Sequence, residues 1–368
     1  MHVALMRGGT SKCVVLQEED LPTAGAARDD LLLRLLGSPD PRQIDGLGGA
    51  TSTTSKVVIV RKSRCAGVDI DYTFAQVAVA EARVDYLGNC GNCASTVGPF
   101  AIREGLIPSR VPTTTVRIFN TNTRKRIIAE IPTDEQGVCE RGDTAIAGVP
   151  GTGAGQVLWF EDPVGTQDRG LLPTGDAQDV FLTRLGPVHA SLVDAGNPVV
   201  FARAADLGLS GTETGRLASW PAGVAEALEE VRGYAAVALG LAPDPSAAAE
   251  SSRNIPKVGV VSQSADYSDI YGRAVAARDQ DITARILSMG TLHEAFALTG
   301  AIALGVAATV AGTTVADVIS GAVPASVRIG HPSGVLSVRL RLDPQGKATA
   351  VGIERTARRL LVGDAFVL

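Results

Sequence analysis

Two segments of this chain are apolar on every side of the helix that they predict, and they limit the fold more than any other feature. The first helix is expected from about Cys93 to Glu104, and the second from about Leu292 to Val310. A helix without a polar face has to be enclosed by other structure. Each half of the chain is therefore expected to build its other elements around one buried central helix.

Runs of β-branched and apolar residues, separated by turn residues, predict strands on both sides of each central helix. The first half contains KVVIVRK and the hairpin TTTVRIFNTNTRKRIIAEIP, and the second contains VHASLVDA, PKVGVVS and GVLSVRLRLD. Each half also contains one further helix, in RDDLLLRLLG and in AGVAEALEEVRGYAAVALG. The pattern predicts an α+β fold of two pseudo-symmetric, β-rich halves, and not the βαβ alternation of a nucleotide-binding sheet.

The length of 368 residues suggests two domains. We expect the boundary near Leu185, which gives an N-terminal domain at residues 1–185 and a C-terminal domain at residues 186–368. The last strand is free to return to the first domain in this scheme.

Charge and composition argue against several classes of partner. The formal net charge is −5, so nothing favours nucleic acid or an anionic membrane surface. The longest apolar run, Ala295 to Gly312, is short for a membrane span, and the N-terminus MHVALMRGGTSK lacks the pattern of a signal peptide. An odd number of cysteines and no secretion signal predict reduced thiols in a cytoplasmic protein.

The segment GNCGNCAS places Cys90 and Cys93 three positions apart, which is typical of three kinds of site. A structural zinc site is disfavoured because it needs four ligands, while the other three cysteines are isolated and the four histidines are scattered. A redox pair would sit at the start of a helix, as this one does, but the small α/β pattern of thioredoxin is missing. The third possibility is an anion-binding turn with one reactive thiol.

That turn would present unpaired backbone N–H groups and the positive end of the helix dipole. Such a site binds a carboxylate, and it is expected to lower the pKa of a thiol placed there. The alternative is that both cysteines are small buried hydrophobes. We favour this alternative for Cys93, which lies one turn into the helix, and a functional role for Cys90.

Lys56 opens the very apolar strand VVIV after the hydroxyl-rich segment GGATSTTS. A lysine drawn inward at such a point loses hydration, which favours its neutral, proton-accepting form. The alternative is an exposed lysine at a strand end. The glycine-rich GVPGTGAGQV is expected to be a loop and not a phosphate-binding loop, because the strand-like VLWFED follows it instead of a helix.

Taken in order, the motifs MRGGTSK, TSKVVIV, DYTFAQV, GNCGN, GPFAI and GVPGTGA resemble those of the PrpF family, and the match continues with DAGNPVVF and HPSG. The resemblance implies a diaminopimelate-epimerase-like fold with the active site between the two halves. It implies a cofactor-independent and metal-independent isomerase that moves carbon–carbon double bonds in small unsaturated di- or tricarboxylates such as 2-methylaconitate. A 4-oxalomesaconate-type tautomerase is the alternative within the family.

By resemblance, the catalytic residues are Ser11, Lys56 and Cys90, with Lys56 as the main proton-transfer group. Ser11 would donate to the developing oxyanion or relay a proton, and Cys90 would help to hold a substrate carboxylate. Two arginines could pair with substrate carboxylates or form structural ion pairs. LSMGTLH is taken as the start of the second buried helix, facing the same cleft, with HPSG opposite. The substrate-binding candidates are Arg7, Asn89, Gly91, Asn92, Arg285, Ser288, Met289, Gly290, Thr291, His331, Ser333 and Gly334.

A two-thiol epimerase is disfavoured because no cysteine follows Cys139. An oxidoreductase that uses Cys90 and Cys93 and a non-catalytic carboxylate-binding protein stay open as alternatives. The expected partner is a small unsaturated polycarboxylate, with a homodimer as the candidate assembly. The sequence does not identify which acid is the substrate.

Overall fold

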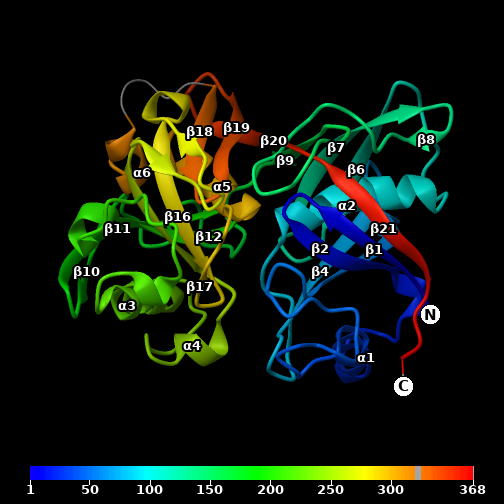
Figure 1. The fold of residues 1–368 in the computed structure, drawn as a ribbon, viewed down its shortest axis with the longest axis horizontal. Helices are drawn as coiled ribbons and strands as arrows, with labels where there is room; N and C mark the ends of the chain where they lie inside the picture. Colours follow the sequence, from blue (N-terminus) through cyan, green and yellow to red (C-terminus); the bar gives the residue numbers. More distant parts are fainter. Residues whose placement is uncertain (320–324, 368) are drawn as a thin grey trace. The chain divides into compact units, whose positions relative to one another are not determined.

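The computed structural model describes residues 1–319 and 325–367 (Figure 1). The chain divides into two compact units. Unit 1 consists of Met1–Phe160 together with the C-terminal stretch from Glu354, and unit 2 consists of Glu161–Ile353. Compared with the expected domains, residues 161–185 group with unit 2, and the C-terminal stretch groups with unit 1.

The main strands of unit 1 follow one another in a hydrogen-bonded path in which antiparallel and parallel neighbours alternate. They are β1 (His2–Gly8), β2 (Ser11–Gln17), β3 (Lys56–Lys62), β4 (Ile70–Val77), β6 (Thr113–Asn120) and β7 (Lys125–Asp134). Shorter or peripheral strands are β5 (Val84–Asp85), β8 (Gly137–Val138), β9 (Gln156–Glu161) and β21 (Ala357–Asp364), of which β21 pairs with β1.

The two helices of unit 1 cover opposite faces of β3. α1 (Ala26–Leu36) connects β2 to β3, and its leucines pack with Val57 and Ile59 of β3. α2 (Gly91–Arg103) is buried at every residue from Gly91 to Ile102. It lies against β1, β2, β3, β4, β6 and β7. Because side chains alternate along a strand, the face of β3 turned away from α1 carries Lys56.

Unit 2 repeats this arrangement with the same alternation of antiparallel and parallel neighbours. The corresponding strands are β11 (Gly186–Ala195), β12 (Asn197–Arg203), β13 (Lys257–Gln263), β16 (Ile282–Ser288), β18 (Ser326–His331) and β19 (Gly334–Leu342). The others are β10 (Asp179–Thr183), β14 (Tyr267–Ser268), β15 (Ala274–Val275), β17 (Thr291–Leu292) and β20 (Ala348–Arg355). The mixed α and β architecture with an internal duplication confirms the predicted fold class.

Two helices of unit 2 correspond to those of unit 1. α3 (Val224–Ala238) connects β12 to β13, as α1 connects β2 to β3. α5 (Leu298–Ala307) is buried at every residue and lies against β11, β12, β18 and β19. The remaining short helices are α4 (Ala248–Ser251), α6 (Thr314–Val318), η1 (Glu18–Asp20), η2 (Ala204–Leu207), η3 (Leu217–Ser219) and η4 (Ala277–Asp279). Within residues 1–319 and 325–367, no helix is long and apolar enough to cross a membrane.

The second central helix begins later than predicted. The expected start at Leu292 is wrong, because Thr291 and Leu292 form β17 and pair with Ser288 and Leu287 of β16. Met289 and Gly290 join the two strands with φ values of 55° and 75°. Two consecutive positive φ angles are typical of the tight turns that connect hairpin strands. The segment LSMGTLH is therefore a hairpin and not the start of a helix.

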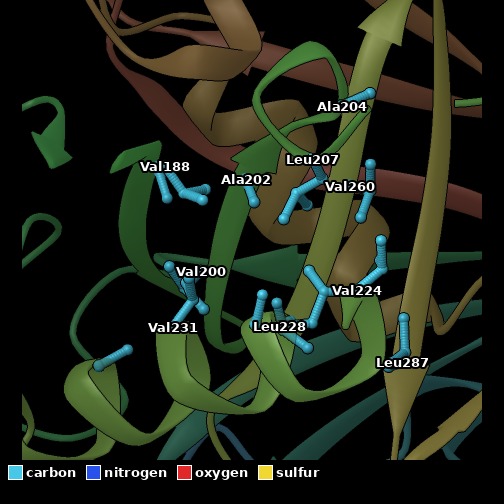
Figure 2. Packing of buried hydrophobic residues seen from close by; sticks show 14 of the residues in the cluster. Val188, Val200, Ala202, Ala204, Leu207, Val224, Leu228, Val231, Val260 and Leu287 are labelled. Atoms are coloured by element: carbon cyan, nitrogen blue, oxygen red, sulfur yellow. The ribbon is translucent and has the colours of Figure 1, made fainter. Parts of the chain in front are cut away.

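Apolar side chains fill the space between α3 and its sheet in unit 2 (Figure 2). Val224, Leu228 and Val231 of α3 pack with Val200 of β12 and Val260 of β13, and all five are at most 1% exposed. Burial of each such side chain stabilises the fold by roughly 1.5–3 kcal/mol. This packing anchors the connection between β12 and β13.

Replacing Leu228 with alanine tests the contribution of this cluster. Because Leu228 is fully buried, we expect Leu228→Ala to lower the free energy of unfolding by about 2–5 kcal/mol. Leu182→Ala is the control, since Leu182 is 73% exposed and its loss should change stability by less than about 0.5 kcal/mol. Urea unfolding measures both, and equal effects of the two variants would contradict the assigned packing.

Candidate active site

Unit 1 brings the three predicted catalytic residues together on the face of the sheet that α2 covers. Ser11 is the first residue of β2, Lys56 is the first residue of β3, and Cys90 directly precedes α2. The Sγ atom of Cys90 lies 3.9 Å from Oγ of Ser11. The positive charge of Lys56 is close enough to the thiol of Cys90 to favour a lower pKa of that thiol.

The turn between β1 and β2 lies against the first turn of α2. A Cβ atom at Gly8 would be 2.4 Å from the backbone oxygen of Asn92, and one at Gly9 would be 2.2 Å from its Oδ1. Gly9 also has a φ of 51°, which side chains disfavour. The two glycines of MRGGTSK are therefore required by this close approach, which places Ser11 beside Cys90.

The side chain of Asn92 holds the contact in place. Its Nδ2 donates to Oγ1 of Thr10 at 3.0 Å, and its Oδ1 accepts from Nε of Arg355 at 3.0 Å. Arg355 is 4% exposed, and burial lowers its pKa to about 10. The Asn92 side chain, which was predicted to bind the substrate, therefore forms hydrogen bonds to other residues of the protein.

The backbone around Cys90 is what this helix end offers to a ligand. The N–H groups of Gly91 and Asn92 belong to the first helical turn, where a helix has no acceptors of its own. Asn89 is buried and its Oδ1 accepts from Nδ2 of Asn120 at 2.8 Å, which fixes the loop before the helix. Tyr72 Oη donates to the backbone oxygen of Cys90 at 3.2 Å.

The thiol of Cys90 caps α2 by accepting a hydrogen bond from the backbone N–H of Cys93 at 3.4 Å. The hydrogen-bonded thiol of Cys93 and burial raise the pKa of Cys90 well above its ordinary value, although Lys56 acts in the opposite direction. Burial also raises the pKa of Cys93. The lowered pKa expected for Cys90 is therefore wrong, because the neighbouring thiol and desolvation outweigh the helix end. Cys90 stays protonated at neutral pH.

Lys56 is drawn inward, as one of the two sequence interpretations proposed. It is 9% exposed, its Nζ donates to Oε1 of Gln76 at 2.5 Å, and it lies 5.1 Å from the ring centroid of Phe74. Nε2 of Gln76 donates to the backbone oxygens of Ser55 and Ser52 at 3.0 and 3.2 Å. These bonds turn the amide oxygen toward the lysine. The hydrogen-bond partner of Lys56 is thus a neutral group, the amide of Gln76.

The structure does not bring Arg7 into this cluster. In the β1–β2 pair, Gly8 lies opposite Ser11 and Arg7 opposite Lys12, so Arg7 is on the other face of the sheet. Its Nη1 donates to the backbone oxygens of Gly9 and Thr356 at 3.1 and 2.9 Å. These bonds tie the glycine turn to the C-terminal stretch.

Arg285 in unit 2 is apart from Ser288 but lies beside the turn that contains His331, since its Nη1 donates to the backbone oxygen of Gly330 at 3.3 Å. Strand alternation places it on the opposite face of β16 from Ser288. It is fully buried, its Nε donates to the backbone oxygen of Glu213, and its guanidinium lies 4.9 Å from the ring centroid of Tyr267. Burial lowers its pKa to about 10.

The other candidates in unit 2 form two separate groups. Ser288, Met289, Gly290 and Thr291 make up the end of β16, the tight turn and the start of β17. His331, Ser333 and Gly334 form the turn between β18 and β19. Oη of Tyr267 donates to the backbone oxygens of His331 and Gly334 at 2.7 and 3.0 Å, and Oγ of Ser333 donates to that of Glu294.

Sequence reasoning missed Gln76 and Lys257. Gln76 stands in the motif DYTFAQV, but only the β3–β4 register places it opposite Lys56. Lys257 opens PKVGVV as Lys56 opens SKVVIV, so an alignment of the two halves would have found it. Over the described residues, no group of histidines, cysteines and carboxylates is arranged to hold a metal ion.

Comparison with known proteins places these observations in context. The model of the PrpF protein family matches residues 1–368. A 3-methylitaconate isomerase from Eubacterium barkeri is 40% identical over 99% of this chain and 96% of its own length. A 2-methyl-aconitate isomerase from Shewanella oneidensis is 41% identical over 97% of this chain and 94% of its own. A 4-oxalomesaconate tautomerase from Pseudomonas putida is 38% identical over 98% and 94%.

Solved structures agree with the fold. A methylitaconate-delta-isomerase superimposes with a TM-score of 0.82 at 40% identity, covering 100% of this chain and 95% of its own. A probable proline racemase from Agrobacterium radiobacter superimposes with a TM-score of 0.55 at 12% identity, covering 100% and 93%, which shows a shared fold alone.

The thiol environment yields a pH prediction. Because Cys93 and burial raise the pKa of Cys90, its alkylation by iodoacetamide should be slow at pH 7 and rise only above about pH 9. Cys93→Ala removes the first of these causes, so the rise should move to lower pH. Mass spectrometry of the peptide that contains Cys90 measures the rate, with the exposed Cys65 as internal reference. Fast alkylation of Cys90 at pH 7 would contradict a protonated thiol.

Proposed function

Because the chain belongs to the PrpF family, we propose that it is a double-bond isomerase of small unsaturated di- or tricarboxylates. The full-length match and the names of relatives that are 38–41% identical support this class of reaction. The observation that carries the proposal is Lys56, a buried lysine with a neutral partner in the same cluster as Ser11 and Cys90.

The reaction moves a proton from the allylic carbon to the far carbon of the double bond. Lys56 in its neutral form removes the allylic proton, and the electron pair of that C–H bond becomes the new double bond. The former double bond shifts its electrons toward the conjugated carboxylate or oxo group, which gains negative charge. The ammonium of Lys56 then returns a proton at the far carbon, so that the base is regenerated and the charges balance.

Ser11 and Cys90 serve the charged intermediate. A hydroxyl at the position of Ser11 can donate to the oxyanion as it forms. Cys90, whose pKa is raised, keeps its proton and acts as a second donor. The N–H groups of Gly91 and Asn92 at the start of α2 can hold a substrate carboxylate. Each of these steps uses groups of the protein alone.

The raised thiol pKa values argue against the oxidoreductase alternative. Thiol–disulfide exchange needs a thiolate, and the pKa values of both Cys90 and Cys93 are shifted away from that form. A non-catalytic carboxylate-binding protein would bind the acid without exchanging its protons with the solvent.

Proton NMR in D₂O is the test of the reaction. We expect double-bond migration with deuterium incorporation in at least one acid of a panel that contains cis- and trans-aconitate, 2-methylaconitate, methylitaconate and 4-oxalomesaconate. Lys56→Ala should lower the rate by about 10²–10⁴-fold, since general base catalysis contributes that much. Lys62→Ala, at the exposed other end of β3, is the matched control and should retain activity. The preferred acid distinguishes an aconitate isomerase from an oxalomesaconate tautomerase.

Gln76→Glu tests the positioning role assigned to Gln76. A carboxylate at this position forms an ion pair with Lys56 in place of the neutral amide, which favours the ammonium over the proton-accepting form. We expect kcat at pH 7 to fall about tenfold or more and the pH optimum to move to higher pH. A merely structural role of Gln76 would lower activity equally at every pH, and a full pH–rate profile separates the two outcomes.

Assembly and compartment stay predictions. The chain is expected to form a homodimer in the cytoplasm. Size-exclusion chromatography with light scattering tests the assembly, and a monomeric mass would contradict it.

A further inference from the structure

The duplication gives Lys56 a counterpart in unit 2. Lys257 is the first residue of β13 as Lys56 is of β3, and each of these strands is parallel to the strand before it. In unit 1, Lys56 lies opposite Gln76 of the neighbouring strand. In unit 2, Val258 of β13 pairs with Leu287 of β16. Lys257 and Ser288 are the next residues along these two strands. Lys257 is 6% exposed, which makes it as buried as Lys56.

The hydrogen bonds of Lys257 orient a hydroxyl. Its Nζ donates to the backbone oxygen and Oδ1 of Asn254 at 3.0 and 3.2 Å, and to Oγ of Ser288 at 3.2 Å. Because the ammonium occupies an acceptor position of the Ser288 hydroxyl, the hydrogen of that hydroxyl points away from the lysine. A neighbouring positive charge also strengthens the hydroxyl as a donor.

This pair lies on the wall of a pocket in unit 2 with a volume of about 530 Å³. That volume is in the range of small-molecule sites. Arg232 and Arg253 supply two further cations to the wall. Glu226 and Glu229 from α3 supply the carboxylates, and Glu229 pairs with Arg232 at 2.8 Å. Together with Lys257, the lining contains three cationic side chains and two carboxylates. This excess of positive charge favours the binding of a small anion.

The turn beside Ser288 closes the same wall. Met289 and Gly290 line the pocket and connect β16 to β17. Met289 has a φ of 55°, a conformation that costs a side chain of this kind free energy.

We propose that Lys257 and Ser288 together bind a carboxylate group of a small polycarboxylate in this pocket, with Ser288 as the hydrogen-bond donor and Lys257 as its positioning residue. This inference rests on the proposed function for the identity of the ligand as a polycarboxylate. Asn254 holds the lysine in place by accepting two of its hydrogen bonds. Lys257 therefore has the same burial and the same place in its strand as Lys56. Its role is to bind a ligand, whereas the role of Lys56 is to transfer a proton.

Binding of tricarballylate, a saturated tricarboxylate that cannot isomerise, tests this pair apart from catalysis. We expect isothermal titration calorimetry to show a Kd at least tenfold weaker in Ser288→Ala and in Lys257→Met than in the unaltered protein. The double variant should lose little more than either single one, because the two residues act as a unit. Lys347→Met removes an exposed lysine of the same unit and should change Kd less than twofold. Thermal unfolding of each variant checks the fold, and Ser288→Ala keeps the charge should Lys257→Met unfold.

The outcomes separate this inference from the proposed function. Unaltered tricarballylate affinity in a folded Ser288→Ala or Lys257→Met protein would overturn it, as would no binding by the unaltered protein. If binding depends on the pair but no acid of the panel isomerises, the carboxylate site stands and the proposed reaction fails. If isomerisation occurs and binding ignores the pair, the reaction stands and the carboxylate site fails.

Discussion

The candidate site of unit 1 depends on the contact between the β1–β2 turn and the first turn of α2. Gly8 and Gly9 leave no room for a Cβ atom against Asn92, and the side chain of Asn92 is fixed by Thr10 and Arg355. This contact brings the start of β2 to the start of α2. Ser11 and Cys90 are neighbours because of it, although 79 positions separate them in the chain. Any side chain at the two glycines would push these elements apart.

The internal duplication shows how one framework can serve two chemical tasks. Both units place a buried lysine at the start of the third strand, with a polar residue of the next strand opposite it. In unit 1 the partner is the amide of Gln76, whose orientation is fixed by two backbone oxygens. In unit 2 the lysine donates to Asn254 and to the hydroxyl of Ser288. These bonds leave the Ser288 hydroxyl as the donor of the pair, which suits binding of an anion.

The thiols show that a helix start does not decide the protonation state of a cysteine by itself. The positive end of α2 favours a thiolate at Cys90, but the adjacent thiol of Cys93 and the loss of hydration favour the protonated form. The pKa of the Cys90 thiol is raised in the structure. A protonated Cys90 fits the role of a hydrogen-bond donor and does not fit that of a redox nucleophile.

The sequence by itself determined the features that depend on local pattern. The two apolar helices, the hairpin around Asn120 and the helix ended by Gly37 follow from periodicity and turn residues, and the ordered motifs indicated the family. Only the tertiary structure decided which side chains meet. Gln76 reaches Lys56 through strand register, Arg7 and Arg285 lie on the far faces of their strands, and the turn at Met289 and Gly290 makes a hairpin where the pattern suggested a helix. The reason is physical: apolar periodicity reports burial, whereas register, facing and the pKa of a thiol are set by residues distant in the chain.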